Sequence, residues 1–211
     1  MRSVKCGPVL DLGCGYGYGS FILRLKISFV VALEVDYDAL SQYANVYYKG
    51  VEYVCADAQH LPFRSNAFKY VIALEVIEHV KNGLRLLKEV HRVLCRKGVL
   101  ILSTPNKRSL LEFIYRKIPV IGRTIFKVDK DVKKNPYHVK EYDLIELVKL
   151  VSYKYRIKRI IGFIIPFLYR KSKFSKILSL YIAHVLPILA SNVMIWAEVK
   201  NRGGKCSNTH L

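Results

Sequence analysis

The sequence predicts an α/β fold with a mostly parallel sheet and helices on both faces, and two observations predict it. Short apolar segments typical of buried strands alternate with amphipathic segments of helical period. In addition, the first apolar segment, Val9–Leu12, runs into four alternate glycines directly before a helix-like segment. Such a turn opens a doubly wound sheet, in which ligands bind at the carboxyl ends of the strands.

The elements follow one another along the whole sequence. Apolar runs predict strands at residues 9–12, 29–33, 51–55, 70–74, 98–102, 155–161 and 193–199. Apolar residues at helical spacing predict helices at 18–26, 37–47, 83–95 and 142–152, and a further helix up to about Leu186. His91 then lies on a helix surface. After Asn106 the alternation breaks for about 35 residues, and we expect substrate recognition there because loops of this length are usually functional.

Composition is typical of one globular domain spanning residues 1–211, with a ligand-binding half at 9–104 and a recognition half at 105–211. The chain has 52% hydrophobic and 24% charged residues, enough apolar side chains for one core. Its five cysteines are scattered without metal-ligand spacing, and no signal peptide is evident. We therefore expect a cytoplasmic protein with reduced thiols.

Three carboxylates stand where successive strands end. Asp11 lies in the first strand, Glu34 follows 23 residues later at the end of the second, and Asp57 follows the third. An acid at the position of Glu34 typically accepts hydrogen bonds from ribose hydroxyls, and Asp57 can accept from the exocyclic amine of a purine. Asp36 and Asp38 are better placed to begin the next helix.

The spacing of the glycines narrows the class of nucleotide ligand that the turn can bind. It departs from the Gly-x-Gly-x-x-Gly pattern of dinucleotide-binding proteins, and no second glycine fingerprint follows. No Gly-Lys-Ser/Thr sequence is present either, which disfavours an ATPase-type phosphate loop.

These residues resemble the class I S-adenosylmethionine-dependent methyltransferases, specifically the methyltransferase type 11-like members. The resemblance runs from about Val9 to about Leu150 and includes Asp11-x-Gly13-Cys14-Gly15-x-Gly17, Glu34, Asp57-Ala58-x-x-Leu61-Pro62-Phe63 and Phe68-x-x-Val71. It implies a Rossmann-like, seven-stranded sheet with an antiparallel last strand. It also implies S-adenosylmethionine as cofactor, bound by Asp11, Gly13, Cys14, Gly15, Gly17, Glu34, Val35, Asp57, Ala58 and Leu74. One departure is Lys69, where relatives usually carry Asp.

A second cluster follows the fourth strand, in Leu74-Glu75-Val76-Ile77-Glu78-His79. In one helical turn Glu75, Glu78 and His79 would share a face, and His138 could join them. With Thr104-Pro105-Asn106, this pattern resembles the quinone-pathway O-methyltransferases and the small-RNA 2′-O-methyltransferases, which implies a Mg²⁺ site. The alternative is a structural Glu-His pair without metal, in which His138 or His79 is the general base.

Charge and apolar residues in the second half suggest the acceptor. The formal net charge is +19, and residues 107–211 hold most of it, with 22 basic and seven acidic side chains. Such a field attracts an anionic partner. The apolar, basic segment 160–190 is either core or a peripheral contact with an anionic membrane surface. We expect O-methylation of a lipid-linked, quinone-like or glycan acceptor. RNA is the alternative acceptor, and a non-catalytic cofactor-binding subunit the alternative class.

Overall fold

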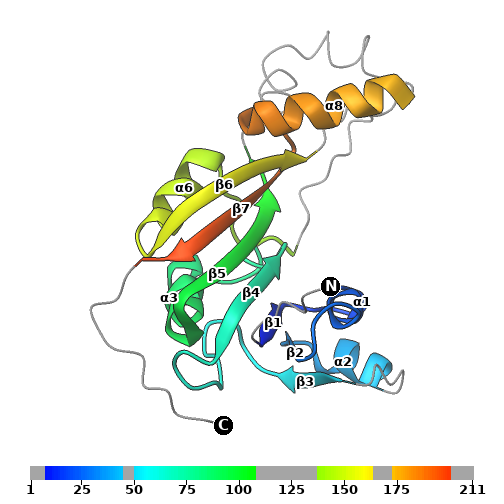
Figure 1. The fold of residues 1–211 in the computed structure, drawn as a ribbon, viewed down its shortest axis with the longest axis vertical. Helices are drawn as coiled ribbons and strands as arrows, with labels where there is room; N and C mark the ends of the chain where they lie inside the picture. Colours follow the sequence, from blue (N-terminus) through cyan, green and yellow to red (C-terminus); the bar gives the residue numbers. More distant parts are fainter. Residues whose placement is uncertain (1–7, 45–49, 108–136, 164–172, 201–211) are drawn as a thin grey trace, which may run out of the picture.

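Seven strands form one mixed sheet in the computed structural model, which describes residues 8–44, 50–107, 137–163 and 173–200 (Figure 1). The strands lie in the order β3-β2-β1-β4-β5-β7-β6. Their bounds are β1 Val9–Leu12, β2 Val30–Glu34, β3 Val51–Cys55, β4 Phe68–Leu74, β5 Leu94–Pro105, β6 Tyr155–Phe163 and β7 Asn192–Val199. Strand β7 runs antiparallel to both neighbours, β5 and β6, and the other pairings are parallel. The predicted doubly wound sheet with an antiparallel last strand is confirmed.

Three helices begin at the predicted residues 18, 37 and 83, and the helix predicted from residue 142 begins at Leu144. The helices are α1 Tyr18–Arg24, α2 Tyr37–Ala44, α3 Gly83–Val93, α6 Leu144–Ser152 and α8 Lys173–Val185, with a short 3₁₀ helix, η1, at Pro187–Leu189. Side chains of Asp36, Asn82 and Asp143 cap α2, α3 and α6 by accepting hydrogen bonds from backbone amides. The helix expected to reach Cys95 ends at Val93, because the chain already enters β5 at Leu94.

The main core lies between the central strands and the helices α3 and α6. Strand β1 is buried along its whole length, as expected of a central parallel strand covered on both faces. Helix α3 contributes Leu86, Leu87 and Val90 to this core. The hydroxyl of Tyr155 on β6 donates to the Leu87 carbonyl at 2.9 Å, which fixes the sheet edge to the helix layer. His91 is half-buried with its ring edge-on to Tyr155, so it packs in this layer rather than on an open helix surface.

The sequence also led to expectations about Lys69, the recognition segment and the apolar segment 160–190. Lys69 of β4, at the position where the resemblance led us to expect Asp, donates from Nζ to the Lys97 carbonyl of β5 at 3.1 Å and so links these two strands. Most of the expected recognition segment, residues 108–136, lies outside the described residues, as do residues 164–172 of the apolar segment. None of the helices that the structure describes combines the length and apolar character needed to cross a membrane.

Candidate functional site

The turn between β1 and α1 depends on glycine. Gly13, Gly15 and Gly17 have φ values of 71°, 51° and 78°, a region that residues with a Cβ rarely adopt. A Cβ on Gly13 would also lie 2.5 Å from Cγ2 of Val76. The amides of Gly13 and Cys14 both donate to the Leu33 carbonyl, at 2.7 and 3.0 Å. The turn is therefore fixed against β2 with its backbone open to a ligand.

Glu34 joins this turn to the end of β2. Its Oε2 accepts from the Gly15 amide at 2.9 Å, and its Oε1 accepts from the amides of Val35 and Asp36 at 2.8 and 3.3 Å. A carboxylate offers about four acceptor positions, so three amides leave capacity for a donor from a ligand.

Asp57 organises the turn after β3. Its Oδ1 accepts from the backbone and side-chain amides of Gln59, at 2.8 and 3.3 Å, and its Oδ2 lies 3.1 Å from Nδ1 of His60. Partial burial acts to raise the pKa of Asp57, but the hydrogen bonds from Gln59 and His60 outweigh it and lower the pKa below its ordinary value. Asp57 is therefore an ionised acceptor at neutral pH.

An ion pair on α3 holds the next part of the same turn. Arg92 donates to the carbonyls of Phe63 and Leu61 at 2.6 and 2.9 Å, and Glu89 accepts from the Leu61 amide at 3.0 Å. Arg92 and Glu89 also pair at 2.8 Å. The segment that follows Asp57 is therefore held in place by hydrogen bonds to helix α3.

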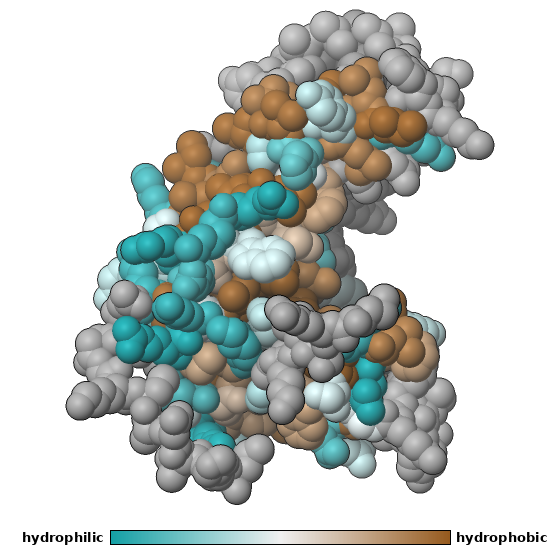
Figure 2. All heavy atoms as spheres, viewed as in Figure 1, coloured by the Kyte–Doolittle hydropathy of each residue, from teal (hydrophilic) through white to brown (hydrophobic). Residues whose placement is uncertain are grey.

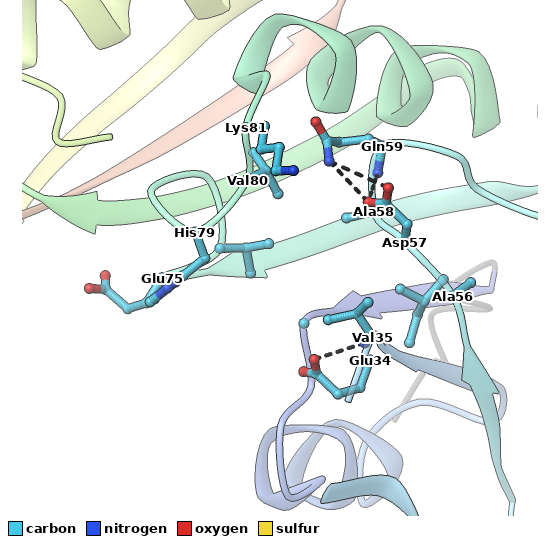
Figure 3. A pocket seen from close by; sticks show the side chains of 13 residues that line it. Glu34, Val35, Ala56, Asp57, Ala58, Gln59, Glu75, His79, Val80 and Lys81 are labelled. Atoms are coloured by element: carbon cyan, nitrogen blue, oxygen red, sulfur yellow. Dashed lines mark hydrogen bonds between the residues drawn. The ribbon is translucent and has the colours of Figure 1, made fainter. Parts of the chain in front are cut away.

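A cavity of about 520 Å³ lies between these turns and the end of β4 (Figure 3). This volume falls within the roughly 300–1,000 Å³ typical of small-molecule sites. Five of the expected cofactor-binding residues line it, namely Gly13, Glu34, Val35, Asp57 and Ala58. The sequence gives no direct indication of the further lining residues Leu33, Ala56, Gln59, Val76, Val80 and Lys81. Most of these flank expected residues, so proximity in sequence was the signal that could have found them.

The other expected cofactor residues, Asp11, Cys14, Gly15, Gly17 and Leu74, stand beside the cavity rather than on its lining. Asp11 is buried and accepts from the Ser20 hydroxyl on α1 at 2.5 Å, and burial raises its pKa. Burial likewise raises the pKa of the Cys14 thiol to about 12, with the charges of Asp11 and Glu34 adding to the rise. Cys14 is therefore a neutral packing residue and no nucleophile at physiological pH.

The expected set of Glu75, Glu78, His79 and His138 is divided in the structure. One ligand atom from each of Glu78, His79 and His138 lies within 4.8 Å of the others. Glu75 does not belong to this group: its φ is 55°, and its carboxylate accepts from the Ser103 hydroxyl at 2.7 Å and from the Asn192 amide at 3.3 Å. The positive φ turns Glu75 toward β5 and β7, which corrects the expectation that all four converge.

Glu78 is a buried acid with one hydrogen-bonded oxygen. It is 1% exposed, and its Oε2 accepts from the Thr104 hydroxyl at 2.9 Å. Its Oε1 has no hydrogen-bond partner among the described residues. Burial raises the pKa of Glu78 from 4.5 to about 7, and the charge of Glu75 adds to the rise.

His79 lines the cavity with a defined orientation. Its Nδ1 lies 3.0 Å from the carbonyl of Tyr137, which can only accept, so Nδ1 carries the proton and Nε2 is the acceptor in the neutral ring. The His138 ring packs edge-on against it, with centroids 5.0 Å apart. Tyr137 and His138, which follow the 108–136 segment, thus contact the turn after β4.

The doubly wound sheet, the glycine turn and the carboxylates around one cavity define a nucleotide-binding α/β protein. Residues 10–102 match the model of the methyltransferase domain family. Residues 10–102, somewhat less than half of the chain, thus carry the methyltransferase domain of the class I S-adenosylmethionine-dependent family.

Two relatives illustrate the match in sequence. A probable S-adenosylmethionine-dependent methyltransferase of Mycobacterium tuberculosis is 31% identical over 143 residues, which are 68% of this chain and 46% of the relative. A malonyl-[acyl-carrier protein] O-methyltransferase of Marinomonas sp. is 30% identical over 64% of this chain and 46% of its own length. The chain thus spans about half the length of these relatives.

The fold is also shared with solved structures. An S-adenosylmethionine-dependent methyltransferase from Mesorhizobium loti aligns with a TM-score of 0.65 over 94% of this chain and 93% of its own. Its sequence identity is 14%, so this similarity concerns the fold.

Proposed function

We propose that the protein transfers a methyl group from S-adenosylmethionine to an oxygen atom of an acceptor. The observation that carries this proposal is the cavity at the carboxyl ends of β1 to β4, which combines a glycine cradle, two carboxylate acceptors and an oriented imidazole. The family match supports the cofactor, and the relative named as an O-methyltransferase supports oxygen as the acceptor atom.

The residues present fit this cofactor. A Cβ at Gly15 would have no atom within 4 Å, so a ligand can approach the backbone of the turn there, whereas at Gly13 the side chain of Val76 packs against the backbone. We assign ribose binding to Glu34, which retains acceptor capacity, and adenine binding to Asp57 and Ala58. Val35 and Leu74 flank these positions. Asp11 and the amides of Gly15 and Gly17 hold the shape of the turn at the methionine end, with Cys14 packed behind it.

When bound, S-adenosylmethionine supplies a methyl group that its sulfonium makes electrophilic. The protein therefore has to align the acceptor oxygen, exclude water and take up the hydroxyl proton as the carbon–oxygen bond forms and the carbon–sulfur bond breaks. We assign the proton to Nε2 of His79, because this atom is the acceptor of the ring and His79 lines the cavity. His138, packed against it, positions the imidazole.

A divalent cation such as Mg²⁺ is the alternative way to activate the hydroxyl. Glu78, His79 and His138 supply one carboxylate and two imidazoles within 4.8 Å, and the second oxygen of Glu78 is buried without a partner in the described part of the chain. A cation held there would lower the pKa of a bound hydroxyl. Activity that survives thorough chelation contradicts this alternative and leaves His79 as the base.

The acceptor that we propose is apolar, anionic or both, such as a lipid-linked, quinone-like or glycan intermediate at the cytosolic face of a membrane. The excess of basic side chains in residues 107–211 supports an anionic acceptor, and RNA is the second candidate for the same reason.

Two measurements test the proposal. Calorimetry with S-adenosylhomocysteine should give a micromolar dissociation constant, about −8 kcal/mol, and no detectable binding would contradict the cofactor assignment. Incubation with methyl-labelled cofactor and separate lipid, RNA and small-molecule extracts should then label the lipid fraction. Label in the RNA fraction would select the second candidate.

A further inference from the structure

Helix α8 buries small side chains and exposes large apolar ones, which is the opposite of a typical core-facing helix. Its small residues Ser179 and Ala183 are fully buried, whereas Ile177 and Tyr181 are 67% and 66% exposed. The exposed apolar side chains Ile177, Leu180, Tyr181 and Val185 recur at helical spacing, and Ile188 of η1 extends them. We call these five residues the α8 face. Figure 2 shows hydrophobic side chains gathered over this end of the molecule.

The close approach of α8 to the sheet explains this orientation. Helix α8 packs on β6 and η1. At Gly162 of β6, a Cβ would collide with the Ala183 carbonyl and would lie 2.7 Å from the Cβ of Ala190. Because strand and helix meet at the distance that glycine and alanine allow, larger side chains have no room on the inner side. Among the described large apolar residues of α8, Ile182 is partly buried against Ala183 and Ala190, and the others are exposed.

The sequence around the α8 face is basic. No carboxylate occurs between Glu146 and Glu198, while nine lysines and arginines lie between these positions. Lys176 is exposed on α8 beside Ile177, and Arg159 is exposed on β6, the strand on which α8 packs. An exposed apolar stripe with a basic surround is the composition of a helix that lies in the interface of an anionic bilayer.

The α8 face is also connected to the cavity edge of the sheet. The side-chain amide of Asn106, after the end of β5, donates to the carbonyls of Ile188 and Ala190, at 3.2 and 3.0 Å. Asn192, at the start of β7, donates to Glu75 at the end of β4. The segment that carries Ile188 is therefore anchored to the same ends of β4 and β5 that border the site.

We propose that the α8 face docks the protein on an anionic lipid surface. At 13 residues α8 is too short to span a bilayer, so it lies in the plane of the interface with Ile177, Leu180 and Tyr181 among the lipids. This docking places the carboxyl edge of the sheet next to the membrane. The biological purpose of this docking rests on the proposed function, but the docking itself requires no methyl transfer.

The test compares two double variants of the full chain in co-sedimentation with vesicles. One carries Ile177→Ser and Tyr181→Ser. The control carries Ile145→Ser and Tyr153→Ser, which remove the same residue types at 58% and 62% exposure, on α6 and just after it. The intact chain should bind vesicles containing phosphatidylglycerol more tightly than vesicles of phosphatidylcholine alone, and added salt should weaken this binding.

We expect the α8 variant to lose binding to phosphatidylglycerol vesicles by about tenfold or more, because apolar burial is lost, and the control to bind as the intact chain does. Equal binding by both variants, or no vesicle binding by the intact chain, would overturn the proposal. So would a dimer in sedimentation velocity that the α8 substitutions dissociate, since a second copy would then cover the face. Calorimetry with S-adenosylhomocysteine on the same variants tests the cofactor assignment independently.

Discussion

The Gly15 amide donates a 2.9 Å hydrogen bond to Oε2 of Glu34, so one carboxylate joins the glycine turn after β1 to the end of β2. Gly15 follows β1 and Glu34 ends β2, and these two adjacent parallel strands pair from Val9–Val30 to Leu12–Leu33. Glu34 thus has a structural and a proposed ligand-binding role, and its replacement affects both.

Glu34→Gln should weaken S-adenosylhomocysteine binding by about tenfold to a hundredfold, because hydrogen bonds to a charged group contribute about 1.5–3 kcal/mol. The substitution keeps the shape of the side chain but replaces one acceptor oxygen by a donor. The matched control is Glu52→Gln, an exposed acid on the neighbouring strand β3. Calorimetry measures the affinity of both variants for S-adenosylhomocysteine. Equal affinities would show that Glu34 does not bind the cofactor.

Gly13→Ala should destabilise the protein more than Gly15→Ala. Both positions have positive φ, which costs a residue with a Cβ about 1–2 kcal/mol. Only at Gly13 does the added Cβ also meet Val76, because nothing lies within 4 Å at Gly15. Denaturant unfolding measures the free-energy difference. Adding Val76→Ala should recover part of the loss for Gly13→Ala alone, and strict additivity would show that the contact is unimportant.

His79→Ala should lower kcat by about a hundredfold or more and leave S-adenosylhomocysteine binding unchanged, because a general base contributes about 10²–10⁴ to the rate. His138→Ala should cause a smaller loss. The pH–rate profile distinguishes the roles, since the ascending limb of the base should disappear only in the His79 variant. A profile altered by His138→Ala alone would assign the proton to His138 instead.

The metal-free protein should lose stability as the pH rises through the range in which Glu78 titrates. The pKa of Glu78 rises from 4.5 to about 7 on folding, so its stabilising contribution is complete below pH 4.5 and is lost as the pH passes 7. The loss amounts to no more than about 3 kcal/mol. Denaturant unfolding in chelator, compared with Glu78→Gln, should show this slope only in the wild type. Identical slopes would place the titration elsewhere.

Local patterns in the sequence were enough to predict the sheet and the closeness of Glu34 and Asp57 at its edge. Strand and helix periods depend on neighbouring residues, and parallel strands bring their carboxyl ends to one edge. Glu34 and Asp57 could therefore be placed together without knowing any long-range contact. The structure shows both of them, with Gly13, on one cavity.

Only the tertiary structure decided how the second cluster is arranged. Glu75 and Glu78 are three residues apart, yet a positive φ and the contact with Asn192, 117 residues away, turn Glu75 out of the group. The proton on His79 is set by a carbonyl 58 residues away. The outward face of α8 likewise follows from its closeness to Gly162. The sequence determined which residues reach the sheet edge, because that depends on local periodicity, whereas side-chain directions there depend on packing between distant segments.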